Sequence, residues 1–134
     1  METIEKTSTQ LRASILVVDD SSLVRLYYRE ALEKTGLAIE EAINGIEAME
    51  KVLAQAFDLV IVDINMPGMD GLTFLRTLRS TADAATTPVL MITTQASKHD
   101  VENARMAGAN FYLVKPVSQA ELVRHACVLT GLPT

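Results

Sequence analysis

Cysteine is nearly missing from this sequence: Cys127 stands alone, and no C-x-x-C pair occurs. An internal disulfide is therefore excluded, and so is a zinc site built from paired thiolates. This cysteine usage fits a reducing cytoplasm. Because Cys127 lies within the apolar run 126–129, we interpret it as a buried residue of the core.

Long hydrophobic runs are also missing. The longest apolar stretches, such as 15–18 and 89–92, span only a few residues, whereas a helix that crosses a bilayer needs about 20. Residues 1–14 are largely polar and do not resemble a secretory signal. We therefore expect neither insertion in a membrane nor secretion.

Positive charge is the scarcer sign, with 12 lysines and arginines against 17 aspartates and glutamates and a net charge of −5. General binding to nucleic-acid phosphates or to an anionic membrane is therefore not expected. Of the 134 residues, 49% are hydrophobic and 22% are charged, which is close to the average of folded globular domains. This length corresponds to one domain and leaves no room for a second catalytic one.

Five short runs rich in valine, isoleucine and leucine alternate with helical stretches along the chain, and glycines or prolines stand between several of them. We expect a flexible arm at 1–13, one domain at 14–130 and a short tail at 131–134. The predicted strands are 14–18, 38–42, 58–62, 88–92 and 110–114, and the predicted helices are 21–35, 45–55, 71–80, 98–107 and 118–130.

This alternation predicts an α/β fold. Strands separated by helices form a parallel sheet with right-handed crossovers, and the helices cover both faces of the sheet. We therefore predict a doubly wound (βα)5 domain with a five-stranded parallel sheet. Ligands of such sheets bind beyond the carboxyl ends of the strands, so the polar residues at those ends are the candidates for function.

Charged and hydroxyl side chains gather at the predicted carboxyl ends. The first strand runs into Asp19 and Asp20, and the third ends at Asp63. The fourth ends at Thr93 and the fifth at Lys115. Two carboxylates about 4 Å apart repel each other by about 1 kcal/mol in water and by more at lower dielectric, so a cation would relieve the cluster. An all-oxygen ligand set selects Mg²⁺, with Mn²⁺ as the alternative.

Each of these residues also has a purely structural interpretation. Asp20 or Ser21 can cap the helix that follows. A lone lysine is usually a solvated charge, and a threonine at a strand end usually packs against its neighbours. Separate structural roles would not require all of these residues to converge on one edge of the sheet, so their convergence favours a functional site.

Four segments carry a resemblance to a known family. They are 15–20 (ILVVDD), 63–71 (DINMPGMDG), 91–93 (MIT) and 112–116 (YLVKP), in the order and spacing of that family. Over residues 14–130 the chain closely resembles the receiver domain of two-component response regulators, notably the single-domain chemotaxis type. The resemblance implies a flavodoxin-like sheet with strand order 2-1-3-4-5, which the hydrophobic pattern alone does not provide.

The resemblance also implies a chemical role for the acidic residues. Asp63 is implied to be the phosphoacceptor, which takes a phosphoryl group from a histidine kinase or a histidine phosphotransfer protein. Asp20, Asp63 and the backbone carbonyl of Asn65 are implied to hold Mg²⁺, and Asp19 to contact it through water. Because the attacking carboxylate and the phosphoryl oxygens are all negative, the reaction needs a divalent cation between them.

Lys115 and Thr93 are implied to contact phosphoryl oxygens, the first as a fixed cation and the second as a hydroxyl donor. Thr93 and Tyr112 form the implied switch, in which the tyrosine changes rotamer as the threonine moves toward the phosphate. Pro116 is implied to follow a cis peptide bond that turns the chain and directs Lys115 into the site.

The remaining candidates lie in the loops around the acceptor. Gly71 is expected to shape the loop after Asp63, and Asp70 to cap the next helix. Asn65 and Gln95 correspond to positions that flank the attacking water in the family, so they are implied to tune dephosphorylation. Thr94 stands where the family usually has a smaller residue, and we expect it to narrow access to the acceptor.

The expected output surface is the face formed by 98–107, 110–114 and 118–130, because Thr93 and Tyr112 border it. Its mixed charge suits a downstream protein rather than nucleic acid, and a homodimer through the same face is the alternative. The candidate contact residues are Lys98, His99, Glu102, Asn103, Arg105, Gln119, Glu121 and Arg124.

Other functions stay open on the sequence, although each meets an objection. A phosphatase of the haloacid dehalogenase type would need an aspartate two residues after the nucleophile, where this chain has Asn65. A flavin carrier would need a phosphate-binding loop where Asp19 and Asp20 would repel phosphate. A receiver-like scaffold without phosphorylation is disfavoured because no site residue is missing. We therefore expect a signalling switch rather than an enzyme, either a lone receiver or part of a longer chain.

Overall fold

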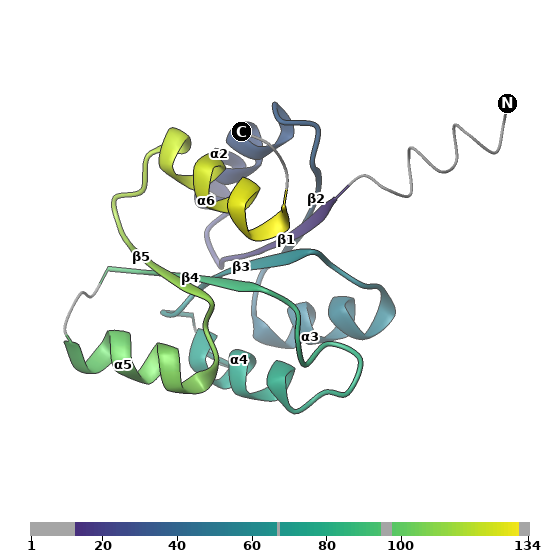
Figure 1. Cartoon of the computed structure of the whole chain (residues 1–134), viewed down its shortest axis with the longest axis vertical. Helices are drawn as coiled ribbons and strands as arrows, with labels where there is room; N and C mark the ends of the chain where they lie inside the picture. The colour runs from purple at the N-terminus through teal and green to yellow at the C-terminus, as the bar shows by residue number, and fades with distance from the viewer. Residues whose placement is uncertain (1–12, 67, 95–97, 132–134) are drawn as a thin grey trace, which may run out of the picture.

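Helices and strands alternate along the whole described part of the chain (Figure 1). The computed structural model describes residues 13–66, 68–94 and 98–131, so nearly all of the expected arm and tail, together with Pro67 and Gln95, lie outside it. The elements are β1 (Ser14–Val18), α2 (Ser22–Glu33), β2 (Ala38–Ala42), α3 (Gly45–Ala54), β3 (Leu59–Asp63), α4 (Gly71–Arg79), β4 (Val89–Thr93), α5 (Lys98–Ala107), β5 (Phe111–Val114) and α6 (Gln119–Thr130).

The strands form one parallel sheet in the order β2-β1-β3-β4-β5, which confirms the order that the family resemblance implied. Figure 1 shows α2 and α6 on one face of this sheet and α3, α4 and α5 on the other. The predicted doubly wound, flavodoxin-like α/β fold is therefore confirmed. Within the described residues, no helix is both long and apolar enough to span a bilayer.

Two hydrophobic layers hold the sheet between its helices. Successive side chains of β1 alternate between them: Ile15 and Val17 pack in the layer that also contains α2 and α6 residues, whereas Leu16 and Val18 pack in the opposite layer. All five residues of β3 are buried. Because helices cover both faces, the central strands are continuously apolar rather than alternating.

The ends of three strands differ from the prediction by one residue. β3 and β4 each begin and end one residue later than predicted, and β5 begins one residue later. The shift has a simple cause, because two polar residues remain in the sheet: Asp63 lies opposite Ile92, and Thr93 lies opposite Val114. Asp63 and Thr93 therefore extend from strand backbone rather than from loops.

At the amino edge of the sheet, Arg79 of α4 ties together the segments that lead into β4 and β5. Its guanidinium donates to the carbonyl of Gly108 at 2.8 Å, to the carbonyl of Thr87 at 2.6 Å and to Oδ1 of Asn110 at 2.9 Å. The amide of Val89 donates to the same Asn110 oxygen at 2.8 Å. Partial burial lowers the pKa of Arg79 from its ordinary value.

Candidate metal and phosphoryl site

Three aspartates meet at the carboxyl edge of the sheet. Asp19 and Asp20 follow β1, and Asp63 is the last residue of the adjacent strand β3. Asp19 is 1% exposed and Asp63 is 6% exposed, whereas Asp20 lies at the surface. One carboxylate oxygen from each residue lies within 4.8 Å of the others. The structure thus brings together the three acidic residues that the sequence singled out.

Backbone amides orient the two buried carboxylates. The amide of Ser21 donates to Oδ1 of Asp19 at 2.9 Å, and the amide of Asn65 donates to Oδ1 of Asp63 at 3.1 Å. Among the described residues, Oδ2 of Asp19 is buried without a hydrogen-bond partner. Nζ of Lys115 lies 3.5 Å from Oδ2 of Asp63 and 3.9 Å from Oδ2 of Asp19. One lysine thus faces two buried carboxylates.

Burial and neighbouring charge change the protonation of one member of the cluster, Asp19. The pKa of Asp19 is raised from 3.8 to about 6, chiefly by burial and also by the charges of Asp63 and Asp20. The hydrogen bond from the Ser21 amide and the charge of Lys115 act in the opposite direction without offsetting the burial. A carboxylate with a raised pKa in a cluster of carboxylates is stabilised when a cation binds beside it.

The donor set fits a hard divalent cation. All three side chains offer carboxylate oxygens, and among the described residues the buried Oδ2 of Asp19 has no hydrogen bond and only the Lys115 ammonium, at 3.9 Å, as a positive partner. Carboxylate oxygens are the ligands that Mg²⁺ prefers, and they are poor ligands for softer metals. The residues present therefore fit the expected magnesium ion.

Two backbone features shape the edges of the site. The Lys115–Pro116 peptide bond is cis, as the family resemblance implied. At the start of α4, a Cβ on Gly71 would lie 2.6 Å from the carbonyl oxygen of Asp63 and 2.7 Å from Cα of Ile64. Only glycine allows the helix to approach the acceptor strand this closely. Asp70 caps α4, its Oδ1 accepting from the Thr73 amide at 2.8 Å, which confirms the predicted cap.

The expected switch residues lie beside the acidic cluster. Thr93 is 1% exposed at the end of β4, next to Asp63 on β3. Burial raises the pKa of Tyr112 on β5, and a hydrogen bond with the Thr93 side chain opposes that shift. The phenol and the threonine hydroxyl are therefore in contact. Asn65 Nδ2 lies 3.5 Å from Oγ1 of Thr93 and of Thr94, and the Thr94 side chain is exposed.

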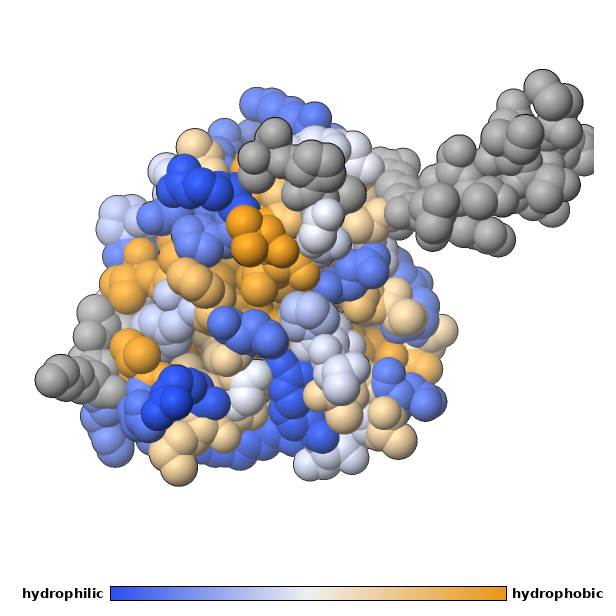
Figure 2. Space-filling model, viewed as in Figure 1, coloured by the Kyte–Doolittle hydropathy of each residue, from blue (hydrophilic) through white to orange (hydrophobic). Residues whose placement is uncertain are grey.

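The expected output surface lies over α5, β5 and α6. His99, Glu102, Arg105 and Arg124 are exposed there, Asn103, Gln119 and Glu121 are half-buried, and the Lys98 side chain lies outside the described part. Sequence reasoning missed two apolar residues of β5, Phe111 and Val114, which are 44% and 37% exposed. Figure 2 shows hydrophobic atoms in the band between the two helices, with hydrophilic atoms on either side.

Sequence reasoning also missed the side chains of α2 that contact the loops of the site. The hydroxyl of Tyr27 donates to the carbonyl of Val117 at 3.0 Å, and Gln119 Nε2 donates to the carbonyl of Tyr27 at 3.0 Å. Arg25 donates to the carbonyl of Asp19 at 2.7 Å. One signal was available in the sequence, because Arg25 and Arg29 are four residues apart and so lie on the same helix face.

A parallel sheet in the order 2-1-3-4-5, with an acidic cluster and a lysine at its carboxyl edge, defines a receiver-type α/β domain. Comparison with known proteins agrees: the family model described as "Response regulator receiver domain" matches residues 15–126. The chain therefore belongs to the receiver-domain family of response regulators.

Two curated relatives illustrate the range of this family. "Transcriptional regulatory protein ResD" of Bacillus subtilis is 39% identical over 109 residues, which are 81% of this chain and 44% of that protein. "Chemotaxis protein CheY-3" of Vibrio cholerae is 38% identical over 109 residues, covering 81% of this chain and 84% of that protein. Among solved structures, the chemotaxis response regulator CheY4 of Vibrio cholerae has a TM-score of 0.84 at 34% identity, covering 88% of this chain and 98% of its own.

Proposed function

We propose that this chain is a phosphoryl-accepting switch of a two-component pathway in the cytoplasm, with Asp63 as the acceptor. One observation carries the proposal: the nearly buried Asp63 lies 3.5 Å from the ammonium of Lys115 and within 4.8 Å of two further carboxylates. Membership in the receiver-domain family supports it. The donor is a phosphohistidine of a kinase or of a phosphotransfer protein.

In the proposed reaction, a carboxylate oxygen of Asp63 attacks the phosphorus. The new O–P bond forms as the P–N bond to histidine breaks, and the electron pair of that bond stays on the imidazole nitrogen. Asp19, Asp20 and Asp63, with the carbonyl of Asn65, would hold Mg²⁺, which when bound neutralises the negative charge shared by carboxylate and phosphoryl oxygens. The position two residues after Asp63 holds Asn65 instead of an aspartate that could act as a general acid, so we propose a switch rather than a phosphatase.

Lys115 and Thr93 complete the proposed site. The ammonium of Lys115 already faces the acceptor, so it can bind one phosphoryl oxygen, and the hydroxyl of Thr93 can donate to another. A move of Thr93 toward the phosphate would alter its contact with Tyr112 and so reach the surface of β5. Asn65 and Gln95 are proposed to set how long the phosphoryl group survives.

The acceptor is tested by incubating the protein with Mg²⁺ and acetyl phosphate and measuring its intact mass. We expect one phosphoryl group on the wild type and none on Asp63→Asn. Asp83→Asn, which removes an exposed carboxylate outside the acidic cluster, is the matched control and should be modified like the wild type. Modification of Asp63→Asn, or none of the Mg²⁺-loaded wild type, would contradict the proposal.

The metal is tested by thermal unfolding with and without Mg²⁺. An ion that binds only the folded state raises its stability by RT ln(1 + [L]/Kd), so the wild type should melt at a higher temperature with Mg²⁺. Asp20→Asn removes one proposed ligand at the surface and should lose most of this shift. An equal shift in both proteins would mean that the ion binds elsewhere.

We further propose that α5, β5 and α6 form the surface that a downstream protein binds. Exposed Phe111 and Val114 supply an apolar centre, and the charged residues of the two helices surround it. Activation should raise partner affinity by about 5- to 150-fold, the usual range for coupled sites. Amide exchange with and without beryllofluoride tests this, because protection confined to the loops around Asp63 would contradict it. Sedimentation of the activated protein separates a partner site from a homodimer.

A further inference from the structure

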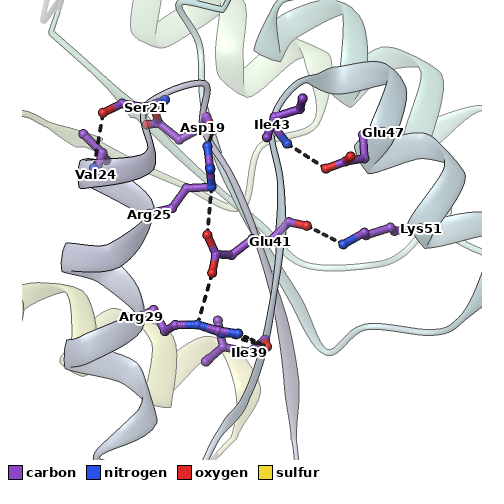
Figure 3. Close-up of polar contacts among 10 residues, drawn as sticks. All are labelled: Asp19, Ser21, Val24, Arg25, Arg29, Ile39, Glu41, Ile43, Glu47 and Lys51. Atoms are coloured by element: carbon purple, nitrogen blue, oxygen red, sulfur yellow. Dashed lines mark hydrogen bonds and ion pairs between the residues drawn. The ribbon is translucent and has the colours of Figure 1, made fainter.

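An arginine of α2 joins the second strand to the acidic cluster. Arg25 is largely buried, with a side chain that is 13% exposed. Its Nε donates to Oε1 of Glu41 on β2 at 2.8 Å, and its terminal nitrogen donates to the carbonyl of Asp19 at 2.7 Å. Figure 3 shows the guanidinium between these two acceptors. One planar group therefore holds a strand side chain and the backbone of the site together.

The Asp19 carbonyl, which accepts the hydrogen bond from Arg25, lies between two neighbouring aspartates. Its carbonyl belongs to the peptide group that joins Asp19 to Asp20, so the orientation of this group sets the direction in which each carboxylate leaves the backbone. The Asp19 amide donates to the carbonyl of Ala42 at 3.1 Å, and Oδ1 of the Asp19 side chain accepts from the Ser21 amide. The hydrogen bond from Arg25 fixes the remaining backbone group of Asp19.

Glu41 has further contacts of its own, so its hydrogen bond with Arg25 restricts the movement of the guanidinium. Its second oxygen accepts from Nε of Arg29 at 3.1 Å, and its backbone carbonyl accepts from Lys51 of α3. Arg29 also donates to the carbonyl of Ile39 at 3.0 Å. Arg29 thus shares Glu41 with Arg25 but anchors to β2 instead of to the aspartates (Figure 3).

We propose that Arg25 is a positioning residue: its guanidinium fixes the peptide between Asp19 and Asp20 and so directs both carboxylates into the metal site. The functional part of this inference rests on the proposed Mg²⁺ site, and the structural part does not. An arginine is required, because its rigid fork serves Glu41 and the Asp19 carbonyl at once, whereas the single ammonium of a lysine cannot reproduce that geometry.

The test compares four full-length proteins: the wild type, Arg25→Ala, Arg25→Lys and Arg29→Ala. Isothermal titration calorimetry with Mg²⁺ measures Kd, and urea unfolding shows that each variant is folded. Loss of the group that orients a metal ligand usually weakens metal binding by about 10- to 100-fold, and we expect that range for both Arg25 variants. Arg29→Ala, the matched control, should bind within about twofold of the wild type, because Arg29 does not contact Asp19.

Three results would overturn the inference: an unchanged Kd in Arg25→Ala, an equal loss in Arg29→Ala, or wild-type binding by Arg25→Lys. The last would mean that positive charge acts rather than geometry. If Arg25→Ala does not fold, Arg25→Lys carries the comparison.

A second measurement, in EDTA, tests the structural part without metal. Amide exchange at Ser21, whose amide bonds to Asp19, should be about tenfold faster in both Arg25 variants than in Arg29→Ala. Equal exchange in all variants would overturn the inference even if Mg²⁺ binds. A wild type that binds no Mg²⁺, with exchange faster only in the Arg25 variants, would refute the proposed metal site and still support Arg25 as the positioning residue.

Discussion

Replacing Asp19 with asparagine is expected to stabilise the metal-free protein above pH 7 while weakening its Mg²⁺ site. The pKa of Asp19 rises from 3.8 to about 6, chiefly because the carboxylate is buried. Each pKa unit corresponds to about 1.4 kcal/mol, so the ionised group costs the folded state up to about 3 kcal/mol. Asparagine keeps an oxygen that can accept from the Ser21 amide and removes the charge. We expect a gain of about 1 to 3 kcal/mol in the free energy of unfolding.

Whether stability rises or falls with pH depends on which state, folded or unfolded, binds the Asp19 proton more tightly. Between about pH 4 and pH 6 the unfolded chain has released the Asp19 proton, whereas the folded protein still retains it. The folded state then binds more protons than the unfolded state, so the wild type loses stability as pH rises through this window. Below pH 4 both states are protonated and the penalty disappears. The advantage of Asp19→Asn should therefore open between pH 4 and pH 6 and remain constant above.

Urea unfolding in EDTA at pH 4, 5, 6, 7 and 8 measures this difference. Other carboxylates titrate in the same range, so the quantity to compare is the variant minus the wild type at each pH. Asp83→Asn, an exposed control, should show a difference near zero throughout. A difference that does not change with pH, or an Asp19→Asn variant less stable than the wild type at pH 8, would refute the reasoning.

Three further substitutions test packing and polar contacts. Gly71→Ala should lower the free energy of unfolding by about 2 to 3 kcal/mol and slow the phosphorylation of Asp63, because the added Cβ would clash with the backbone of Asp63 and Ile64. Arg79→Lys should cost about 3 kcal/mol, since one ammonium cannot serve the carbonyls of both Gly108 and Thr87. Ser118→Ala should cost about 1 kcal/mol by removing the cap that accepts from the Glu121 amide. Denaturant unfolding measures all three free energies.

Matched variants separate these causes from general damage. Gly68→Ala also replaces a glycine of the acceptor loop, but its Cβ would meet nothing within 4 Å, so it should cost only about 1 kcal/mol from its positive φ. Arg76→Lys, on the exposed side of α4, should stay within about 0.5 kcal/mol of the wild type. Ser118→Asn should retain most of the cap. Losses in a control that equal those in its partner would contradict the assigned contact.

The sequence was sufficient for the alternation of elements and for the residues at the carboxyl edge. Apolar runs such as Leu59–Val62 can be recognised as buried strands, because strands covered on both faces do not alternate between apolar and polar residues. The exact strand ends could not be predicted from the sequence. Asp63 and Thr93 remain paired within the sheet, and hydropathy cannot distinguish a polar residue inside a strand end from one just beyond it.

Long-range polar contacts could not be predicted. That Arg25 reaches Glu41 depends on the crossing of α2 over β1 and β2, and no local pattern reports that angle. The strand order could not be predicted from the hydrophobic pattern either, because the periodicity of β5 is equally consistent with several neighbouring strands. The order came from the family resemblance, and the structure confirms it. The exposure of Phe111 and Val114 could not be predicted either, because an edge strand and a central strand have similar composition.

The hydrogen bonds of Arg79 hold β4 and β5 at the end of the sheet opposite to the acidic cluster. Because the segments entering β4 and β5 share one guanidinium, these strands are pinned where they begin, while Thr93 and Tyr112 lie toward their far ends. Displacements of both strands should therefore be smallest where Arg79 holds them and should grow toward the acidic cluster. Backbone order parameters measured by NMR should then decrease from Val89 to Thr93, and removing the guanidinium should abolish that gradient.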